Sequence, residues 1–142
     1  HGHISVHAED MLVLPSDVEA CLEYANVGVL GKGRHGYLHC RSGLQETLRE
    51  RWLEYPTLRE NFLLLTIDEA SGAGLFGPDS LKMEVRPRVG DFVTVAINSS
   101  TLVSPKEKEE HAHHCQGAHG SLLPEEMDIP LIICRQRKGD SY

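Results

Sequence analysis

The sequence predicts a small mixed α+β domain, with one small mixed sheet, one main amphipathic helix and several short helices. The chain has 142 residues, which is an ordinary length for one domain. Short apolar runs alternate along it with helical patterns, as expected when strands and helices share one core. Hydrophobic residues make up 40% of the chain and charged residues 25%, a balance too apolar for a disordered chain.

The first elements are short. A brief apolar run over 11–14 precedes a helix expected over about 17–24, which begins after Pro15 with a capping box at Ser16 and Glu19. A glycine-rich loop follows. Residues 35–41 then alternate in polarity as in a half-buried strand.

The main helix is expected over 43–55, because four apolar or aromatic residues recur there at helical spacing and Pro56 stops the pattern. These residues define the buried face of the helix: Leu44, Leu48, Trp52 and Tyr55. Trp52 is interpreted as a core residue.

Two further strands, over 61–66 and 91–97, complete the predicted sheet, and both read as buried on their two faces. Thr66 and Glu69 have the spacing of a capping box between them. Polar residues dominate 98–120, which indicates an exposed loop. A helical turn over 124–127 and a last buried strand over 129–134 are expected at the end.

Charge and cysteine content restrict the partners and the compartment. The formal net charge of −7 argues against a nucleic acid or an anionic membrane as partner, and no apolar run approaches the ~18 residues of a transmembrane helix. Cysteines 21, 40, 115 and 134 form no Cys-x-x-Cys pair, which indicates free thiols in a reducing, cytoplasmic compartment. Cys40 and Cys134 are expected in buried strands and Cys115 in the polar loop.

Nine histidines are many for this length, and several lie close together in the polar loop. Imidazole and thiolate groups are common zinc ligands, so one interpretation is a metal site within this loop. Neighbouring side chains on one short segment rarely all reach one ion. A solvated loop is therefore the preferred interpretation for His111, His113 and His114. The weak metal candidates are His111, His113, His114 and Cys115, with His119 close behind them.

The segment 119–132, His-Gly-Ser-Leu-Leu-Pro-Glu-Glu-Met-Asp-Ile-Pro-Leu-Ile, resembles a signature of the alkaline phosphatase superfamily. In its type I phosphodiesterase/nucleotide pyrophosphatase branch, a His-Gly pair precedes a Leu-x-x-Glu-Glu-Met-x-Val-Pro-Leu segment. The resemblance implies that the domain is part of an alkaline-phosphatase-like α/β enzyme and that His119 is a ligand of one of two metal ions.

His1 and Gly2 resemble the end of an Asp-His-Gly motif that lies upstream of the His-Gly motif in this family. The resemblance implies that His1 is a ligand of the second metal ion, while His3 corresponds to no ligand. A second interpretation is that the first residues are the remnant of an affinity tag.

The middle of the chain resembles the segment inserted between these two motifs, somewhat like a cap. The similar stretches are Gly33-Arg34, Tyr37-Leu38, 73–78 and 88–91. The expected organisation is a core fragment and connector at 1–30, an inserted α+β subdomain at 31–104, a polar His-rich loop at 105–118, and a core fragment with a tail at 119–142.

The resemblance implies two-metal phosphoester hydrolysis in a longer parent protein, with zinc favoured over manganese. The nucleophilic Thr or Ser and most metal ligands are expected upstream, so no catalytic residue is assigned here and the chain alone is expected to be inactive. The implied partners are the rest of the catalytic core and a phosphoester or nucleotide substrate. The alternative function is a metal-binding or partner-binding module that uses the loop 111–119.

Overall fold

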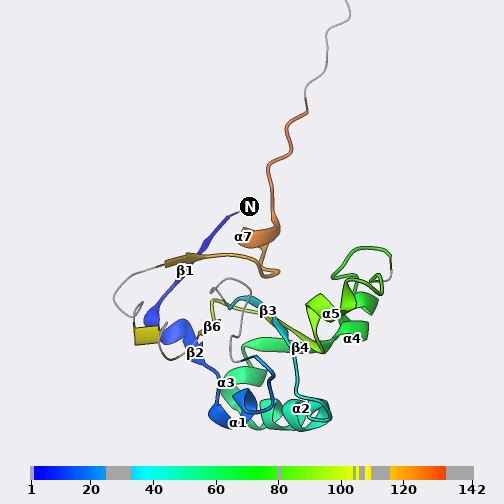
Figure 1. Ribbon diagram of the computed structural model, residues 1–142. Helices are drawn as coiled ribbons and strands as arrows, with labels where there is room; N and C mark the ends of the chain where they lie inside the picture. The colour runs from blue at the N-terminus through cyan, green and yellow to red at the C-terminus, as the bar shows by residue number, and fades with distance from the viewer. Residues whose placement is uncertain are drawn as a thin grey trace, which may run out of the picture.

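The structure is a computed structural model that describes residues 2–24, 33–79, 81–103, 105, 108–109 and 116–133. Its strands are β1 (Ile4–Val6), β2 (Met11–Val13), β3 (His35–Leu38), β4 (Phe62–Thr66), β5 (Phe92–Ala96), β6 (Thr101–Val103) and β7 (Gln116–Ala118). Its helices are η1 (Ala8–Asp10), α1 (Ser16–Glu19), α2 (Gln45–Glu54), α3 (Pro56–Arg59), α4 (Ile67–Gly72), α5 (Arg86–Val89) and α7 (Pro124–Met127). This is the predicted mixed α+β fold with short helices, but the described strands form three small sheets instead of one (Figure 1).

The largest sheet has the order β3-β5-β4, and its neighbouring strands are antiparallel. Helices α1, α2 and α3 lie together below it in Figure 1. The three strands predicted for this sheet and the main helix are confirmed, with shorter bounds. Leu48 and Trp52 of α2 are buried as predicted, and the Trp52 ring meets the Phe62 ring edge to face at a centroid distance of 6.3 Å.

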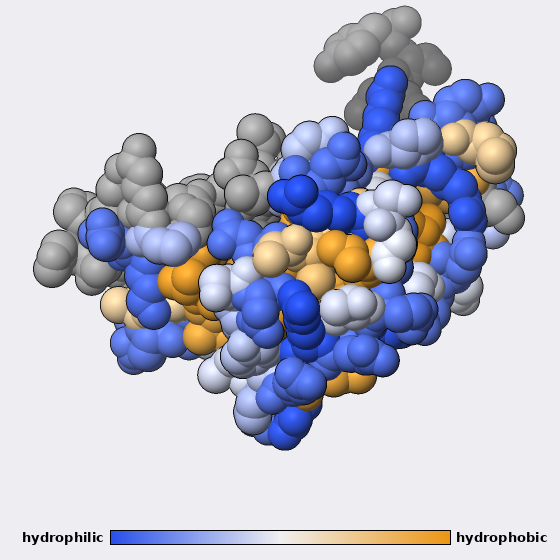
Figure 2. Space-filling view, turned by 60° about the horizontal axis from the view of Figure 1, so that its bottom comes forward, coloured by the Kyte–Doolittle hydropathy of each residue, from blue (hydrophilic) through white to orange (hydrophobic). Residues whose placement is uncertain are grey.

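Burial differs between the two apolar strands that were predicted to be covered on both faces. Every residue of β5, the central strand, is buried. Strand β4 forms one edge of the sheet, and Leu63 on it is 42% exposed, so the prediction is wrong for β4. The reason is the place of β4 in the sheet. A side chain on an edge strand has side chains of a neighbouring strand on one side only, so less of its surface is covered than on a central strand. The face of the molecule that carries α1, α2 and α3 is seen in Figure 2, where apolar residues form separate areas between hydrophilic ones.

Local capping was predicted correctly at one helix and wrongly at another. At α4 the Thr66 hydroxyl accepts a hydrogen bond from the Glu69 N–H at 3.1 Å, and the Glu69 carboxylate accepts one from the Thr66 N–H at 2.7 Å. This is the expected capping box. At α1, Pro15 is the N-cap, no side chain caps the helix, and the helix ends at Glu19.

The predicted exposed loop over 98–120 contains two strands. Strand β6 is fully buried and pairs in parallel with β2, and β7 pairs antiparallel with β1. Each is three residues long, so neither has a polarity pattern long enough to be distinguished from a loop. The loop prediction is wrong for these two stretches.

The last predicted strand is not formed over its described part. Residues 129–133 have no regular structure, and Ile129, Leu131, Ile132 and Ile133 are between 72% and 83% exposed. Figure 1 shows this segment leaving the body of the molecule after α7. An apolar run needs a neighbouring strand to be buried, and the described residues offer none here; Pro130 also lacks the N–H that a sheet would use.

The two described cysteines are buried and free. Cys40 is buried as predicted, and this burial raises the pKa of its thiol to about 12. Cys115 and Cys134 lie outside the described residues. Among the helices that the structure describes, none has the length and apolar character needed to cross a membrane.

Candidate functional site

The N-terminal segment of the described chain meets the segment that follows the polar loop. Strand β1 pairs with β7 in the register Ile4↔Ala118 and Ser5↔Gly117. Since the strands are antiparallel, the residues that precede Ile4 lie beside those that follow Ala118. The N-terminal segment is therefore brought to the His119-Gly120 pair, and we call this meeting point the junction.

Gly2 is in close contact with the helical turn α7. Its backbone N–H donates a hydrogen bond of 3.0 Å to the carbonyl oxygen of Glu125. A Cβ atom at position 2 would lie only 2.4 Å from the same oxygen. A side chain at this position would therefore push the N-terminal segment away from α7, so the junction requires a glycine here.

Two histidine rings meet at the junction. The rings of His3 and His119 are in edge-to-face contact, with centroids 4.7 Å apart. Of the two metal ligands that the resemblance implies, His119 lies here on the surface, while His1 falls outside the described residues. His3, which corresponds to no ligand in the resemblance, is the histidine that contacts His119.

A buried ion pair lies directly beneath the junction. Both oxygens of the Glu126 carboxylate accept hydrogen bonds from the Arg34 guanidinium, each at 2.6 Å, in a two-pronged arrangement. Both side chains are 0% exposed. We call this pair the clasp, because Arg34 precedes β3 and Glu126 belongs to α7, so it fastens the middle of the chain to the segment that carries His119.

Further hydrogen bonds satisfy the clasp. A terminal nitrogen of Arg34 donates to the carbonyl oxygens of Asn98 and Ser100, at 2.6 and 2.9 Å. The Ser121 N–H donates to Glu126 at 3.1 Å. Burial alone would raise the pKa of the Glu126 carboxyl, but the guanidinium and this N–H hold it below its ordinary value. Glu126 is thus ionised at neutral pH in spite of its burial.

Gly33 positions Arg34 for this role. Its φ is +37°, and a Cβ there would lie 1.7 Å from the carbonyl oxygen of Leu102. The Leu102 N–H in turn donates to the Gly33 carbonyl at 2.9 Å. Only glycine allows the chain to pass this close to the backbone of β6 and deliver the next side chain into the core.

The sequence did not identify the clasp. Of the two neighbouring acids in the helical turn α7, Glu125 is exposed, but Glu126 is buried. The signal that could have found the pair is that Arg34 belongs to one stretch that resembles the family, Gly33-Arg34, and Glu126 to another, the segment 119–132. Opposite charges in two motifs that meet are candidates for a contact.

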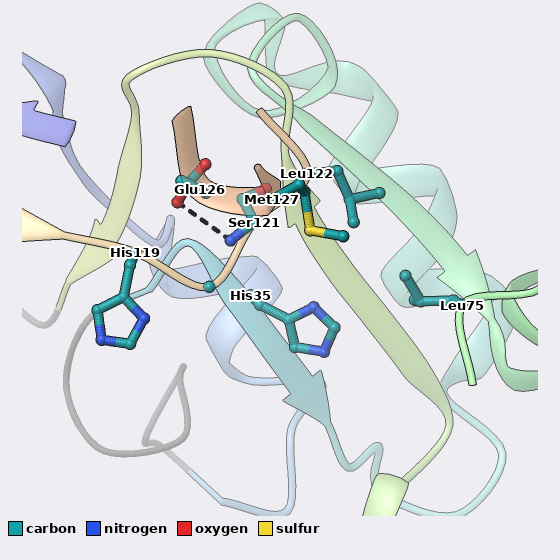
Figure 3. Close-up of a pocket in the computed structure, with 8 residues that line it drawn as sticks. His35, Leu75, His119, Ser121, Leu122, Glu126 and Met127 are labelled. Atoms are coloured by element: carbon teal, nitrogen blue, oxygen red, sulfur yellow. Dashed lines mark hydrogen bonds between the residues drawn. The ribbon is translucent and has the colours of Figure 1, made fainter. Parts of the chain in front are cut away.

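An open hollow of about 400 Å³ lies beside His119, and we call it the junction hollow. Figure 3 shows the segment 119–127 on one side of it, and His35 of β3 and Leu75 on the other. Leu122 and Met127 add apolar surface. His35 is half-buried, and this burial lowers its pKa below the ordinary value.

The described residues hold no group of three or more His, Cys, Asp or Glu side chains arranged to bind a metal ion. The loop candidates His111, His113, His114 and Cys115 lie outside these residues, as does His1. The described part therefore supplies one of the implied ligands, His119. One ligand is too few for an ion that needs about four from protein and water, so the described residues do not form a metal site by themselves.

Comparison with models of known protein families, with curated proteins and with solved structures gave no match to this chain.

Proposed function

We propose that this chain is the C-terminal part, with its inserted subdomain, of a metal-dependent phosphodiesterase or nucleotide pyrophosphatase of the alkaline phosphatase superfamily. The junction is the observation that carries the proposal. Residues 1–2 and 119–132 are the two segments that resemble motifs of one active site. The Gly2–Glu125 hydrogen bond and the His3–His119 contact bring residues 2 and 3 beside the start of the second segment.

The position of the middle region supports the same proposal. A segment inserted between two motifs must leave the site and return to it. The chain leaves the junction after β1 and returns at β7, and β3, β4, β5 and α2 lie between these points. The clasp then fixes the start of the insert, at Arg34, to the segment that carries His119.

The exposed apolar segment 129–133 is the surface that we assign to the rest of the catalytic core. Four exposed aliphatic side chains in five residues are unusual on a protein surface without a partner. Under the proposal, a parallel sheet of the parent covers them, as the resemblance implies for a core strand.

In the parent, two divalent ions, zinc or manganese, would stabilise the attacking and leaving oxygens of the phosphoester. His119 would bind one ion and His1 the other. The nucleophilic Thr or Ser and the remaining ligands would come from the part of the core that precedes this chain. Two buried free thiols, Cys21 and Cys40, agree with a reducing compartment, and we propose a cytoplasmic location.

The test is hydrolysis of bis(4-nitrophenyl) phosphate by the complete protein encoded by the reading frame that contains this chain. The proposal predicts turnover that a chelator abolishes and zinc or manganese restores. His119→Ala should lower kcat/KM by orders of magnitude, because it removes a metal ligand. The control is His7→Ala, since His7 is exposed and lies outside the junction hollow.

Under the proposal, the nucleophile and most of the metal ligands belong to the rest of the parent protein, so the 142-residue chain alone should not hydrolyse this ester. Metal-dependent turnover by the chain alone would contradict the proposal. Stoichiometric zinc binding by the chain, lost in a His113/His114 double variant but kept in His1→Ala, would favour the metal-binding module instead.

A further inference from the structure

We propose that the junction hollow binds an uncharged, apolar alcohol group of the phosphoester, and that His35 and Leu75 of the inserted subdomain select this group. The inference rests on the proposed function and narrows its substrate class. It favours phosphodiesters of apolar alcohols over pyrophosphate-linked substrates, in which the neighbouring group is a second phosphate.

The hollow has the position that this role needs. It begins at His119, the metal-ligand position, and extends to Leu75 in the insert, so a group attached to a phosphate held near His119 would lie over it (Figure 3). Its volume of about 400 Å³ lies within the range of small-molecule sites. Since the insert forms one wall, a change in the insert changes the shape of the hollow.

The polar groups at the base of the hollow are already engaged. The carboxylate of Glu126 is bound by Arg34, and the Ser121 N–H donates to that carboxylate. The Ser121 hydroxyl donates to the carbonyl oxygen of Ala96. Both Glu126 and Ser121 are buried, and these hydrogen bonds already occupy their polar groups, so they have little capacity to bind a ligand.

The accessible walls are apolar or aromatic. Leu122 is 48% and Met127 56% exposed, and Leu75 faces them across the hollow together with the His35 ring. Methionine and leucine side chains make good dispersion contacts with a flat ring. An apolar group would bury this surface, and burial of apolar area is the main source of affinity that the walls can supply.

The charge of the hollow argues against an anionic occupant. No lysine or arginine is among the described residues that line it, and the carboxylate beneath is neutralised by the clasp. Sites for a phosphate group usually present guanidinium or ammonium groups, or several backbone N–H donors. A second phosphate would lose its hydration here without gaining such partners.

The test measures binding to the 142-residue chain, with phenol, phenyl phosphate and inorganic phosphate as probes. NMR of methyl-labelled chain follows the Met127, Leu122 and Leu75 methyl groups. We expect saturable shifts with phenol and phenyl phosphate at Kd values on the order of 1 mM, and no shifts with inorganic phosphate. Leu75→Ala and Met127→Ala should each weaken phenol binding about 3- to 10-fold.

Leu53→Ala is the matched control. Leu53 is 54% exposed, close to the 56% of Met127, but it lies on α2 outside the junction hollow. Met127→Ala changes an exposed side chain, so it remains informative if Leu75→Ala fails to fold. Shifts with inorganic phosphate, or phenol binding unchanged in Met127→Ala, would overturn the inference. Neither readout needs metal or turnover, so a failure here is separable from the absence of hydrolysis by the complete protein.

Discussion

The sheet with α2 and the junction with its clasp are stabilised by different kinds of contact. The first is an apolar core in which Leu48, Trp52 and Phe62 are all buried against one another. The second depends on a buried ion pair and on one close backbone approach at Gly2. Apolar packing loses stability in proportion to the volume removed, whereas a buried ion pair fails when either partner is lost.

The difference has a consequence for function. The apolar core makes the middle of the chain a folded body, but the clasp and the Gly2 contact decide where that body lies relative to His119. Variants of the core should therefore lower the stability of the middle of the chain, and variants of the clasp should change the junction. The predictions below compare the two regions, from the largest expected effect to the smallest.

Trp52→Ala should have the largest effect. Trp52 is 1% exposed, and its removal leaves a cavity that should lower the free energy of unfolding by about 3–5 kcal/mol. Urea unfolding measures this, and the native Trp52 emission should be that of a buried indole. The neighbouring exposed Leu53 provides the control, because Leu53→Ala should change the free energy by less than about 0.5 kcal/mol. An emission spectrum of a fully solvated indole would contradict the core assignment.

Glu126→Gln breaks the clasp while it keeps the shape of the side chain. It leaves the Arg34 charge buried without its partner, so the free energy of unfolding should fall by about 3 kcal/mol. The control is Glu125→Gln. Glu125 lies on the same turn but is exposed, so this change should leave the free energy of unfolding almost unchanged.

A paired variant tests the reason. Replacing both partners, Arg34→Met with Glu126→Leu, removes the buried charges together and should cost less than Glu126→Gln alone. If the double variant is the less stable of the two, the clasp does not work as an ion pair.

The clasp also predicts a dependence of stability on pH. The pKa of Glu126 is lower in the folded protein than its ordinary value, so the unfolded chain binds a proton more readily. This contribution is complete above the ordinary carboxyl pKa and is lost as the pH falls through the depressed folded pKa. The wild type should lose stability more steeply than Glu126→Gln between about pH 5 and pH 2 in urea titrations. If the stability of the wild type and of Glu126→Gln fell equally steeply with pH, the pKa of Glu126 would not be lowered in the folded protein.

Gly2→Ala should have the smallest and most local effect. The added methyl group would clash with the Glu125 carbonyl, which should cost about 1 kcal/mol at the junction. Amide hydrogen exchange should speed up in β1 and β7 and stay unchanged in β5. Ser5→Ala, on an exposed position of β1, is the control. Faster exchange throughout the sheet would contradict the separation of the two regions.

The sequence predicted the apolar core well because the information there is local. The spacing of Leu48 and Trp52 marks a helix face, and the apolar run of β5, broken only by Thr94, marks a buried strand. It predicted little of the junction. Strand β7 is too short to show a period, and the partners of the clasp are 92 residues apart. The segment 129–133 was predicted to be buried because composition describes what a segment prefers, not whether a neighbour covers it.

The central claim is that residues 2–6 meet the segment 116–125, and a nuclear Overhauser experiment on the labelled chain tests it directly. The structure predicts cross-peaks between the rings of His3 and His119, and between Ile4 and Ala118 across the β1–β7 pair. Residues 2–6 with random-coil shifts and no cross-peak to 116–125 would contradict it. The two segments would then not form one site in this chain, and the proposed function would lose the observation that supports it.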